Sequence, residues 1–551
     1  MKIADTGDIW WKTAVIYCLD VENFLDVDGD GVGDFGGLTD KIDYLADLGV
    51  TCIWLMPFYP TPDADDGYDV SDFYGVDPRL GSHGDVVEFV RTARSRGIRV
   101  IIDLVVNHTS DKHPWFINAR RSRNARYRDY YVWRDRPTRK QKNEVFPGEE
   151  ESIWEWDERT GQYFLHSFYK HQPDLNIANP AVRDEIAKII AFWLTIGVSG
   201  FRMDAVPFLL ESPGGPYETD PHEFLRDVKR FARRRSSEAM LLGEVALPHD
   251  QQADYYGENA GELDSQFDFT TMQAVYLSMV REEASPIVDA LKTRPAINEP
   301  VSWVNMLRNH DELTLALLSE KEKNEVLDAL APDPAQRAYG RGILRRLAPM
   351  LQGDMRRIRL AYSLMFSLPG NPLLFYGEEL GMGENAEIAG RMSVRTPMQW
   401  TPGRNAGFSD ARPSQLIAPL PGGGYAPVHV NVIDQQKEPD SLFHFVRDLA
   451  HRYRSLPEIG WGDLDLVQAG PGGAFVHSLA TPSARFVAAH NLSAEPVQLE
   501  VNLPDAVEGD VVLSDLLSPG YLDVKDDRSC SFELDAYGFQ WFRVVPREKL
   551  G

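Results

Sequence analysis

The fold is decided by a stretch that reads VTCIWLMPF (50–58), HGDVVEFVRTARSRG (83–97) and RVIIDLVVN (99–107). Its first and last segments are nearly continuous in apolar and β-branched residues, which is typical of strands buried on both faces of a parallel sheet. The middle segment has apolar residues at helical spacing and ends in glycine, which suits a helix C-terminus. The stretch therefore predicts a strand–helix–strand unit.

The same alternation extends in both directions along the chain. A helix is predicted at LTDKIDYLADLG (38–49). Further strands are predicted at AVIYCLDV (14–21), VSGFRMDAV (198–206), AMLLGEVAL (239–247), QFDFTT (266–271), VSWVNMLRNHDE (301–312) and NPLLFYGEEL (371–380). Eight strands alternating with helices predict an α/β fold of the (β/α)8 TIM-barrel type. A doubly wound sheet is disfavoured, because no glycine-rich phosphate turn follows the first strand.

Two stretches interrupt the alternation, and a third follows it. Residues 108–174 are irregular, aromatic and too long for an ordinary loop, which predicts an inserted lid subdomain between barrel segments 1–107 and 175–455. Residues 313–356 are charged and helical in pattern, an excursion after the seventh strand. Short alternating segments separated by Pro, Gly and Asp predict a C-terminal antiparallel β-sandwich over 456–551.

The composition limits the classes of binding partner and the cellular compartment that we expect. The chain has 57 Lys+Arg against 83 Asp+Glu, a net charge of −26, which disfavours nucleic acid or an anionic membrane surface as a partner. No apolar run reaches the roughly 20 residues that span a bilayer, and the first residues lack the apolar core of a signal peptide. Cys18, Cys52 and Cys530 have no metal-ligand spacing and are predicted to be reduced, buried thiols. We expect a soluble, cytoplasmic protein.

Two acidic residues close predicted neighbouring strands. Retaining cleavage of a glycosidic bond needs two carboxyls about 5 Å apart, and Asp204 and Glu244 are placed where a barrel builds its site. Arg202 lies two residues before Asp204, on the same side of the strand, and would keep that carboxylate ionised. Glu244 follows a glycine in an apolar strand, which would raise the pKa of its carboxyl. The alternative for any strand-end acid is a solvated or salt-bridged side chain.

A third carboxylate follows the seventh strand in RNHDE. Asp311 is preceded by His310. This combination suits sugar hydroxyls, which offer both hydrogen-bond donors and acceptors.

Four segments together resemble the signature regions of the α-amylase superfamily, glycoside hydrolase family 13. They are DLVVNH (103–108), GFRMDAV (200–206), GEVAL (243–247) and NHDE (309–312), and HQPDLN (171–176) resembles an additional family motif. The resemblance implies that Asp204 is the nucleophile, Glu244 the acid/base and Asp311 the carboxylate that holds the sugar, with Asp103 as structural support. It implies sugar binding by Asp65, Tyr68, His108, Arg202, His310 and Arg391.

Within the superfamily the chain most resembles trehalose synthases, then α-glucosidases and oligo-1,6-glucosidases. SDKHPWF (110–116), FYKHQPDLN (168–176), APDPAQRAYGRGILRRLAPML (331–351) and RTPMQW (395–400) carry this likeness. The DDGY motif (65–68) implies a pocket closed behind one terminal glucose, and therefore small α-glucosides such as maltose, trehalose or sucrose. No organic cofactor is expected, and related enzymes make a homodimer conceivable.

The chain departs from the trehalose synthase pattern at three places. Glu244 is followed by Val-Ala-Leu instead of Ala-Asn-Gln, residues 263–275 differ, and Arg391 is followed by Met392 instead of Asp. All three are expected near the acceptor side of the site. We therefore expect mainly hydrolysis or glucosyl transfer. Trehalose synthase activity is the alternative, a polymer-acting amylase is disfavoured by DDGY, and a catalytically dead binding barrel is disfavoured by the intact acids.

Two structural Ca²⁺ sites are expected. DVDGDGVGD (26–34) places Asp26, Asp28, Asp30 and Asp34 in one glycine-rich loop, which suits a hard cation. It resembles the Ca²⁺ loop of oligo-1,6-glucosidases and trehalose synthases, with the Val32 carbonyl as a further ligand. An acidic solvated turn is the alternative. By resemblance to trehalose synthases, a second site would use Asn107, Asp174 and Glu211 with the carbonyls of Phe208 and Leu209.

Overall fold

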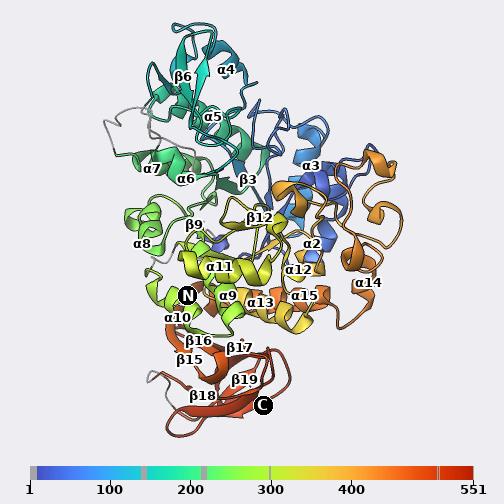
Figure 1. Cartoon of the computed structure of the whole chain (residues 1–551). Helices are drawn as coiled ribbons and strands as arrows, with labels where there is room; N and C mark the ends of the chain where they lie inside the picture. The colour runs from blue at the N-terminus through green and yellow to red at the C-terminus, as the bar shows by residue number, and fades with distance from the viewer. Residues whose placement is uncertain are drawn as a thin grey trace.

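The computed structural model describes residues 9–137, 145–211, 220–296, 300–504, 507 and 509–549, except the side chain of Glu211. The barrel forms the middle of the molecule, with the 108–174 segment at one end and the C-terminal sheets at the other (Figure 1). In these ranges no helix is both long enough and apolar enough to cross a membrane.

Eight parallel strands close the barrel within the described ranges, and all eight were predicted. Their order around the barrel is β1-β14-β10-β9-β8-β7-β3-β2, so the first strand pairs with both the second and the last. The strands are β1 (Ile16–Leu19), β2 (Cys52–Leu55), β3 (Arg99–Leu104), β7 (Gly200–Met203), β8 (Met240–Gly243), β9 (Ser265–Phe267), β10 (Ser302–Met306) and β14 (Asn371–Phe375). Nearly all of their residues are buried, as their continuous apolar sequences require.

The observed strands are shorter than the predicted segments. β9 ends at Phe267, because the Asp268 side chain accepts a hydrogen bond from the Thr271 N–H and caps helix α9 (Phe269–Arg281). β10 ends at Met306, so His310 and Asp311 lie in the loop beyond it. Asp204, Glu244, His310 and Asp311 therefore follow the C-terminal ends of their strands, where a barrel places its active site.

Helices cover the outside of the barrel. The predicted helix 38–49 is divided at Lys41 into α1 (Phe35–Asp40) and α2 (Ile42–Leu48), and α2 ends at Gly49, whose φ of 93° is left-handed. The other long helices are α3 (His83–Ser95), α5 (Pro180–Ile196), α7 (Glu223–Arg235), α9, α10 (Ser285–Thr293), α13 (Met355–Ser367) and α15 (Leu442–Arg454).

The 108–174 segment contacts the loop after β2, where Gln172 Nε2 donates to Asp65 Oδ2 at 2.7 Å. It contains α4 (Pro114–Ala119) and an antiparallel sheet of β4 (Trp133–Arg134), β6 (Gln162–Leu165) and β5 (Trp154–Asp157). The segment 313–356 contains α11 (Glu320–Leu330), α12 (Leu347–Met350) and a sheet of β11 (Leu313–Thr314), β13 (Gly342–Ile343) and β12 (Arg337–Ala338). The two insertions touch: the rings of Phe146 and Tyr339 are 5.2 Å apart, and Arg341 Nη2 donates to the Val145 carbonyl at 2.6 Å.

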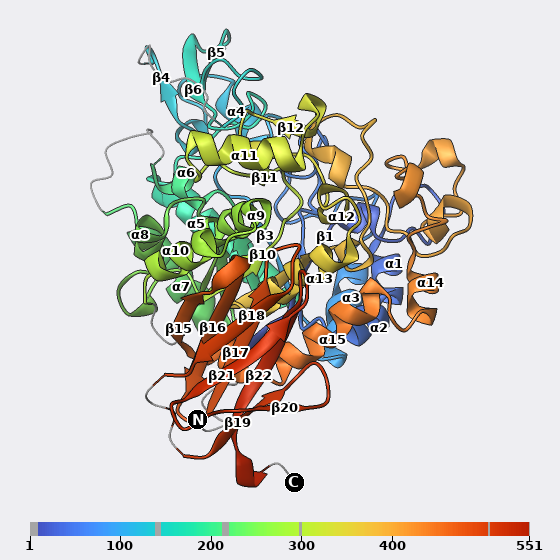
Figure 2. The same ribbon diagram turned by 60° about the horizontal axis from the view of Figure 1, so that its bottom comes forward.

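The C-terminal region is a separate pair of antiparallel sheets that pack on each other (Figure 2). The larger has the order β15-β16-β17-β22-β19-β20 and the smaller consists of β18 and β21. Their bounds are β15 (Asp463–Ala469), β16 (Ala474–Thr481), β17 (Ala484–Asn491), β18 (Val497–Asn502), β19 (Val511–Asp515), β20 (Tyr521–Asp523), β21 (Ser529–Leu534) and β22 (Phe539–Pro546). Cys18, Cys52 and Cys530 are buried free thiols, as predicted.

Candidate active site

Arg202 joins the acidic residues of the predicted site. It lies on β7 with 1% of its surface exposed and faces Asp103 of β3 in the strand register. Its Nη1 atom is 2.5 Å from Asp103 Oδ1 and 2.6 Å from Asp204 Oδ1, while Nη2 is 2.7 Å from Glu244 Oε2. The two carboxyls predicted to do chemistry are thus bound to the two terminal nitrogens of one guanidinium group.

The backbone after Asp204 is shaped around the same group. Ala205 adopts a left-handed conformation with φ of 46°, which is unfavourable for a residue with a Cβ atom. Its N–H donates to Glu244 Oε2 at 3.1 Å. The turn therefore ties the residue after Asp204 to the carboxyl of Glu244.

One cation is shared by the buried Asp103 and Asp204 and the half-buried Glu244, and this sets their ionisation. Burial raises the pKa of Asp204 to about 6 and that of Glu244 to about 7, although Arg202 lowers both. Burial likewise raises the pKa of Asp103 to about 6. A pKa of about 6 leaves Asp204 mostly ionised at neutral pH, and a pKa of about 7 leaves Glu244 protonated much of the time, as a general acid requires.

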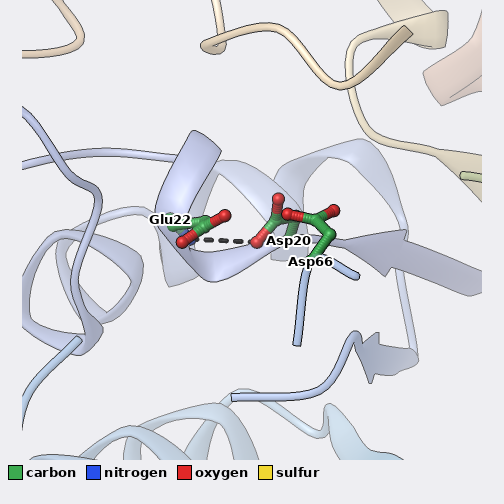
Figure 3. A group of neighbouring side chains, drawn as sticks. All are labelled: Asp20, Glu22 and Asp66. Carbon is green, nitrogen blue, oxygen red and sulfur yellow. Dashed lines mark hydrogen bonds between the residues drawn. The ribbon is translucent and has the colours of Figure 1, made fainter. Parts of the chain in front are cut away.

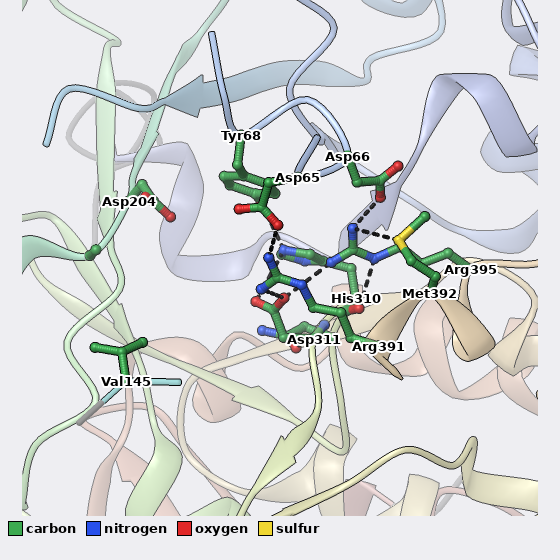
Figure 4. Close-up of polar contacts among 12 residues, drawn as sticks. Asp65, Asp66, Tyr68, Val145, Asp204, His310, Asp311, Arg391, Met392 and Arg395 are labelled. Carbon is green, nitrogen blue, oxygen red and sulfur yellow. Dashed lines mark hydrogen bonds and ion pairs between the residues drawn. The ribbon is translucent and has the colours of Figure 1, made fainter. Parts of the chain in front are cut away.

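Asp311 has the opposite environment, a single carboxylate between two arginines. Its Oδ1 atom is 3.0 Å from Arg391 Nη1 and 3.1 Å from Arg395 Nη2 (Figure 4). Arg391 also binds Asp65, and Arg395 also binds Asp66. Burial opposes the ionisation of Asp311, but His310, Arg391 and Arg395 together outweigh it and the pKa of Asp311 falls below its ordinary value. Asp311 is therefore a permanent anion near neutral pH.

Aromatic and histidine side chains connect the two acidic groups. The Tyr68 hydroxyl is 2.7 Å from His310 Nε2, and their rings are stacked with an interplanar angle of 6°. His108 Nε2 lies 3.1 Å from the Tyr68 carbonyl. Burial holds the pKa of His310 well below its ordinary value and lowers that of His108 to about 4, so both rings are neutral. Every residue predicted to contact the sugar is thus brought to this one region.

The acidic loop after β1 converges only in part. Oxygen atoms of Asp26, Asp28 and Asp34 lie within 4.8 Å of one another, whereas Asp30 is outside this group. Asp26 and Asp34 are buried and accept backbone N–H groups, including those of Gly31 and Gly37 at 2.8 and 2.7 Å. These three aspartates fit a hard cation by ligand type and spacing.

The second predicted metal group is only partly described. Asn107 Nδ2 donates to Asp174 Oδ1 at 3.3 Å, and Ser167 N–H donates to the same oxygen at 3.0 Å. Phe208 and Leu209 lie on α6 (Val206–Glu211), and the Glu211 side chain lies outside the described residues. Burial raises the pKa of Asp174 to about 7.

Most of the chain matches a known protein family. The family model described as alpha amylase, catalytic domain, matches residues 19–330 and 344–459. The chain belongs to the α-amylase family. Residues 484–543 match a second model, the sucrose hydrolase-like C-terminal domain.

Named members of the α-amylase family align along almost the whole chain. A trehalose synthase from Pimelobacter sp. (strain R48) is 40% identical over 98% of this chain and 97% of its own length. An oligo-1,6-glucosidase from Parageobacillus thermoglucosidasius is 32% identical, covering 83% and 86%. Among solved structures, an α-amylase from H. orenii superimposes with a TM-score of 0.78 at 28% identity, covering 97% and 100%. An inactive double mutant of MutB in complex with isomaltulose gives 0.77 at 26%, covering 97% and 99%.

Sequence reasoning missed several residues that complete this α-amylase-family site. Arg395 and Asp66 form a second brace beside Asp311, and Trp54 Nε1 donates to Asp103 Oδ2 at 2.7 Å. In the sequence Arg395 is only the first residue of the RTPMQW motif, and Asp66 is only the second residue of DDGY. The available signal was an arginine with no acid near it in sequence, whose partners had to come from distant segments.

The three departures from the trehalose synthase pattern are not equivalent in space. Nearly all of residues 263–275 are buried, in β9, in α9 and beside them. Val245 is also fully buried, and its carbonyl accepts from Gln252 Nε2 at 2.7 Å. Met392 is different, because its sulfur lies 3.7 Å from Arg395 Nη1. It therefore lies beside the Asp311 clamp, which consists of Asp311, Arg391 and Arg395.

Proposed function

We propose that the protein is a retaining enzyme that acts on small α-glucosides, by hydrolysis or by transfer of a glucosyl group. The observation that carries this proposal is the binding of Asp204 and Glu244 to one buried guanidinium. Such an arrangement supplies a mostly ionised carboxylate and a partly protonated carboxyl side by side, which double displacement at an anomeric carbon requires. The names of the aligned relatives, trehalose synthases and oligo-1,6-glucosidases, support the same substrate class.

In the first step, the Asp204 carboxylate attacks the anomeric carbon while Glu244 donates its proton to the leaving glycosidic oxygen. The glycosidic bond breaks as a glucosyl ester of Asp204 forms, and Glu244 becomes a carboxylate. In the second step, Glu244 removes a proton from the acceptor hydroxyl, whose oxygen attacks the anomeric carbon and releases Asp204. Water as acceptor gives hydrolysis and a sugar hydroxyl gives transfer.

Asp311 and its neighbours would hold the reacting glucose. Asp311 stays ionised and would accept hydrogen bonds from sugar hydroxyls, while Tyr68 offers an aromatic face. Arg391 links Asp311 to Asp65, and this ion pair would block the chain beyond one terminal glucose. A blocked end supports small α-glucosides over the interior of a polymer.

The preferred acceptor remains a separate question. We propose hydrolysis or transfer as the main outcome, because Met392 places a thioether beside the clamp where trehalose synthases carry an acid. The second candidate is isomerisation of maltose and trehalose, which the trehalose synthase relatives favour.

The test is product analysis after incubation of the purified enzyme with maltose, trehalose or sucrose, beside the Asp204→Asn variant. Release of glucose or new glucosides supports the main proposal. Conversion of maltose mostly to trehalose selects the second candidate. Turnover that survives in Asp204→Asn at the wild-type rate contradicts the nucleophile assignment and the proposed mechanism.

We also propose a structural Ca²⁺ held by Asp26, Asp28 and Asp34, with Asp30 and the Val32 carbonyl as outer partners. The Asp26 carboxylate also accepts the Ser409 hydroxyl at 2.5 Å, so the ion would fasten the loop after β1 to a late segment of the chain. Removal by a chelator should lower the melting temperature by several degrees, and Ca²⁺ should restore it. An unchanged melting temperature contradicts the proposal. A second ion at Asn107 and Asp174, with Glu211 and the Phe208 and Leu209 carbonyls, is proposed on the same test.

A further inference from the structure

Arg395 is completely buried and uses its whole guanidinium on one loop and its anchor. Its Nε atom donates to the His310 carbonyl at 3.0 Å and Nη2 lies 3.1 Å from Asp311 Oδ1. Nη1 binds Asp66 (Figure 4). Arg395 therefore holds both the backbone and the side chain at the point where the loop after β10 presents Asp311.

The anchor, Asp66, is itself held by two more acids. Carboxylate oxygens of Asp20, Glu22 and Asp66 lie within 4.8 Å of one another (Figure 3). Glu22 is 7% exposed, and its Oε2 atom is 3.5 Å from Arg79 Nη1. Asn23 Nδ2 donates to Asp20 Oδ2 at 2.6 Å. Arg79 and Asn23 thus hold two of the three acids in place.

Within this cluster, Asp66 is the acid that binds Arg395. Two cations reach the cluster, and each is shared with acids outside it: Arg79 also binds Asp63 and Asp77, and Arg395 also binds Asp311. Burial and the neighbouring acids raise the pKa of Glu22 far above its ordinary value, so it is the acid that keeps a proton. A protonated Glu22 can donate a hydrogen bond to Asp66. The Asp66 carboxyl also binds Arg395.

We propose that Arg395 is a positioning residue for Asp311 and that Asp66, supported by Glu22, fixes Arg395 in the orientation this requires. The inference rests on the proposed function, because it concerns how Asp311 is aimed at the bound sugar. Arg391 cannot do this alone. Arg391 is more exposed, with 15% of its side chain accessible. Within the loop after β10 it binds only the carboxylate of Asp311, whereas Arg395 also binds the carbonyl of His310.

The consequence is a separable effect on turnover. Both arginines donate to Asp311 Oδ1, and His310 Nε2 lies 3.2 Å from Oδ2. Without Arg395 the carboxylate can turn about its side-chain bonds, and small misplacements of a group that acts in the transition state cost rate more than ground-state binding. Among the described residues Asp66 makes no hydrogen bond or ion pair with Asp311, so its effect on Asp311 must pass through Arg395.

The experiment compares Arg395→Lys, Asp66→Asn and the double variant with Arg346→Lys as the matched control. Arg346 is equally buried and binds Glu378 at 3.2 Å and two backbone carbonyls, but none of the active-site acids. Steady-state kinetics on maltose and on nitrophenyl α-glucoside would give kcat and KM. Thermal melting would report stability.

We expect Arg395→Lys to lower kcat by about 10²-fold with little change in KM, because a single ammonium cannot reproduce the fork. Asp66→Asn should lower kcat by a smaller factor, about tenfold, and the double variant should be no worse than Arg395→Lys alone. Arg346→Lys should lower the melting temperature about as much as Arg395→Lys does, and should leave kcat/KM near that of the wild type.

Several outcomes would overturn the proposal while leaving the function intact. One is a wild-type enzyme that turns over maltose while Arg395→Lys does so equally well. Another is strict additivity of the two substitutions, which would mean that Asp66 acts independently of Arg395. If Arg395→Lys fails to fold, Asp66→Asn decides by its own kcat. Absence of turnover in the wild type would instead contradict the proposed function.

Discussion

Two regions of the site solve the same electrostatic problem in opposite ways. Around Arg202, one cation is shared by Asp103, Asp204 and Glu244, and the pKa values of these acids rise to about 6, 6 and 7. Around Asp311, two arginines bind the same carboxylate oxygen, although each also binds a second acid, and the pKa of Asp311 falls. Glu244 and Asp311 are equally half-buried, with 21% and 22% of their side chains exposed, so burial alone does not explain why their pKa values move in opposite directions. The number of arginines that bind each carboxyl distinguishes the region proposed to move protons from the region proposed to hold the sugar.

Removing the acid from the Arg202 region should have the largest effect. Glu244→Gln leaves the shape but no proton to give, so kcat on maltose should fall by about 10²- to 10⁴-fold. The loss should be smaller on nitrophenyl α-glucoside, whose leaving group needs less protonation. Steady-state kinetics on both substrates measure this, and equal losses on the two would argue against an acid role for Glu244.

Changing the shared cation should have the next largest effect. Arg202→Lys keeps one positive charge but cannot reach Asp204 and Glu244 together, and we expect kcat/KM to fall by about 10²-fold. The acidic limb of the pH profile should also move to higher pH, because Asp204 loses part of its stabilising charge. The matched control is Arg346→Lys. An unmoved limb in Arg202→Lys would mean that the arginine does not set the pKa of Asp204.

The pH profile of the wild type sharpens the comparison without any substitution. Asp204 must be ionised, so kcat/KM should fall about tenfold per pH unit below its pKa of about 6. Glu244 must be protonated, so activity should fall in the same way above about 7. The two groups share Arg202, so the limbs report the pair. Asp311 should add no limb in this range, and a third inflection between these two would contradict its assignment as a permanent anion.

The smallest effect concerns Glu22 behind the clamp. Its pKa is raised in the folded protein, so the stability it contributes is present below its unfolded pKa of about 4.3 and is lost as the pH rises. Gln has the same shape and no proton to lose. The free energy of unfolding of Glu22→Gln, measured by urea denaturation, should therefore rise relative to that of the wild type between pH 5 and pH 9. A difference that is constant with pH would mean that Glu22 is ionised.

The barrel could be predicted from sequence because buried parallel strands leave a simple pattern. Each of the eight strands is short, apolar and followed by a polar turn, and none depends on a distant residue to be recognised. The prediction erred where a local hydrogen bond overrides that pattern, as at Asp268, which begins a helix inside QFDFTT.

The site was predicted to the extent that its residues end strands. Asp204 and Glu244 follow β7 and β8, and their positions require only the order of the strands. Arg395 and Glu22 were out of reach, because their meaning depends on contacts with Asp66 and Asp311 across the fold. An arginine or a glutamate gives no sign in the sequence of which charges will surround it.

The pairing of β1 with β14 has a consequence for folding during synthesis on the ribosome. Ile16 of β1 lies opposite Leu373 of β14, so one edge of the first strand has no partner until nearly the whole barrel has left the ribosome. Until then the nascent chain exposes an apolar strand edge, which invites association with other chains. We expect folding to be completed late in translation, and a chaperone that shields this edge to raise the yield of the native protein.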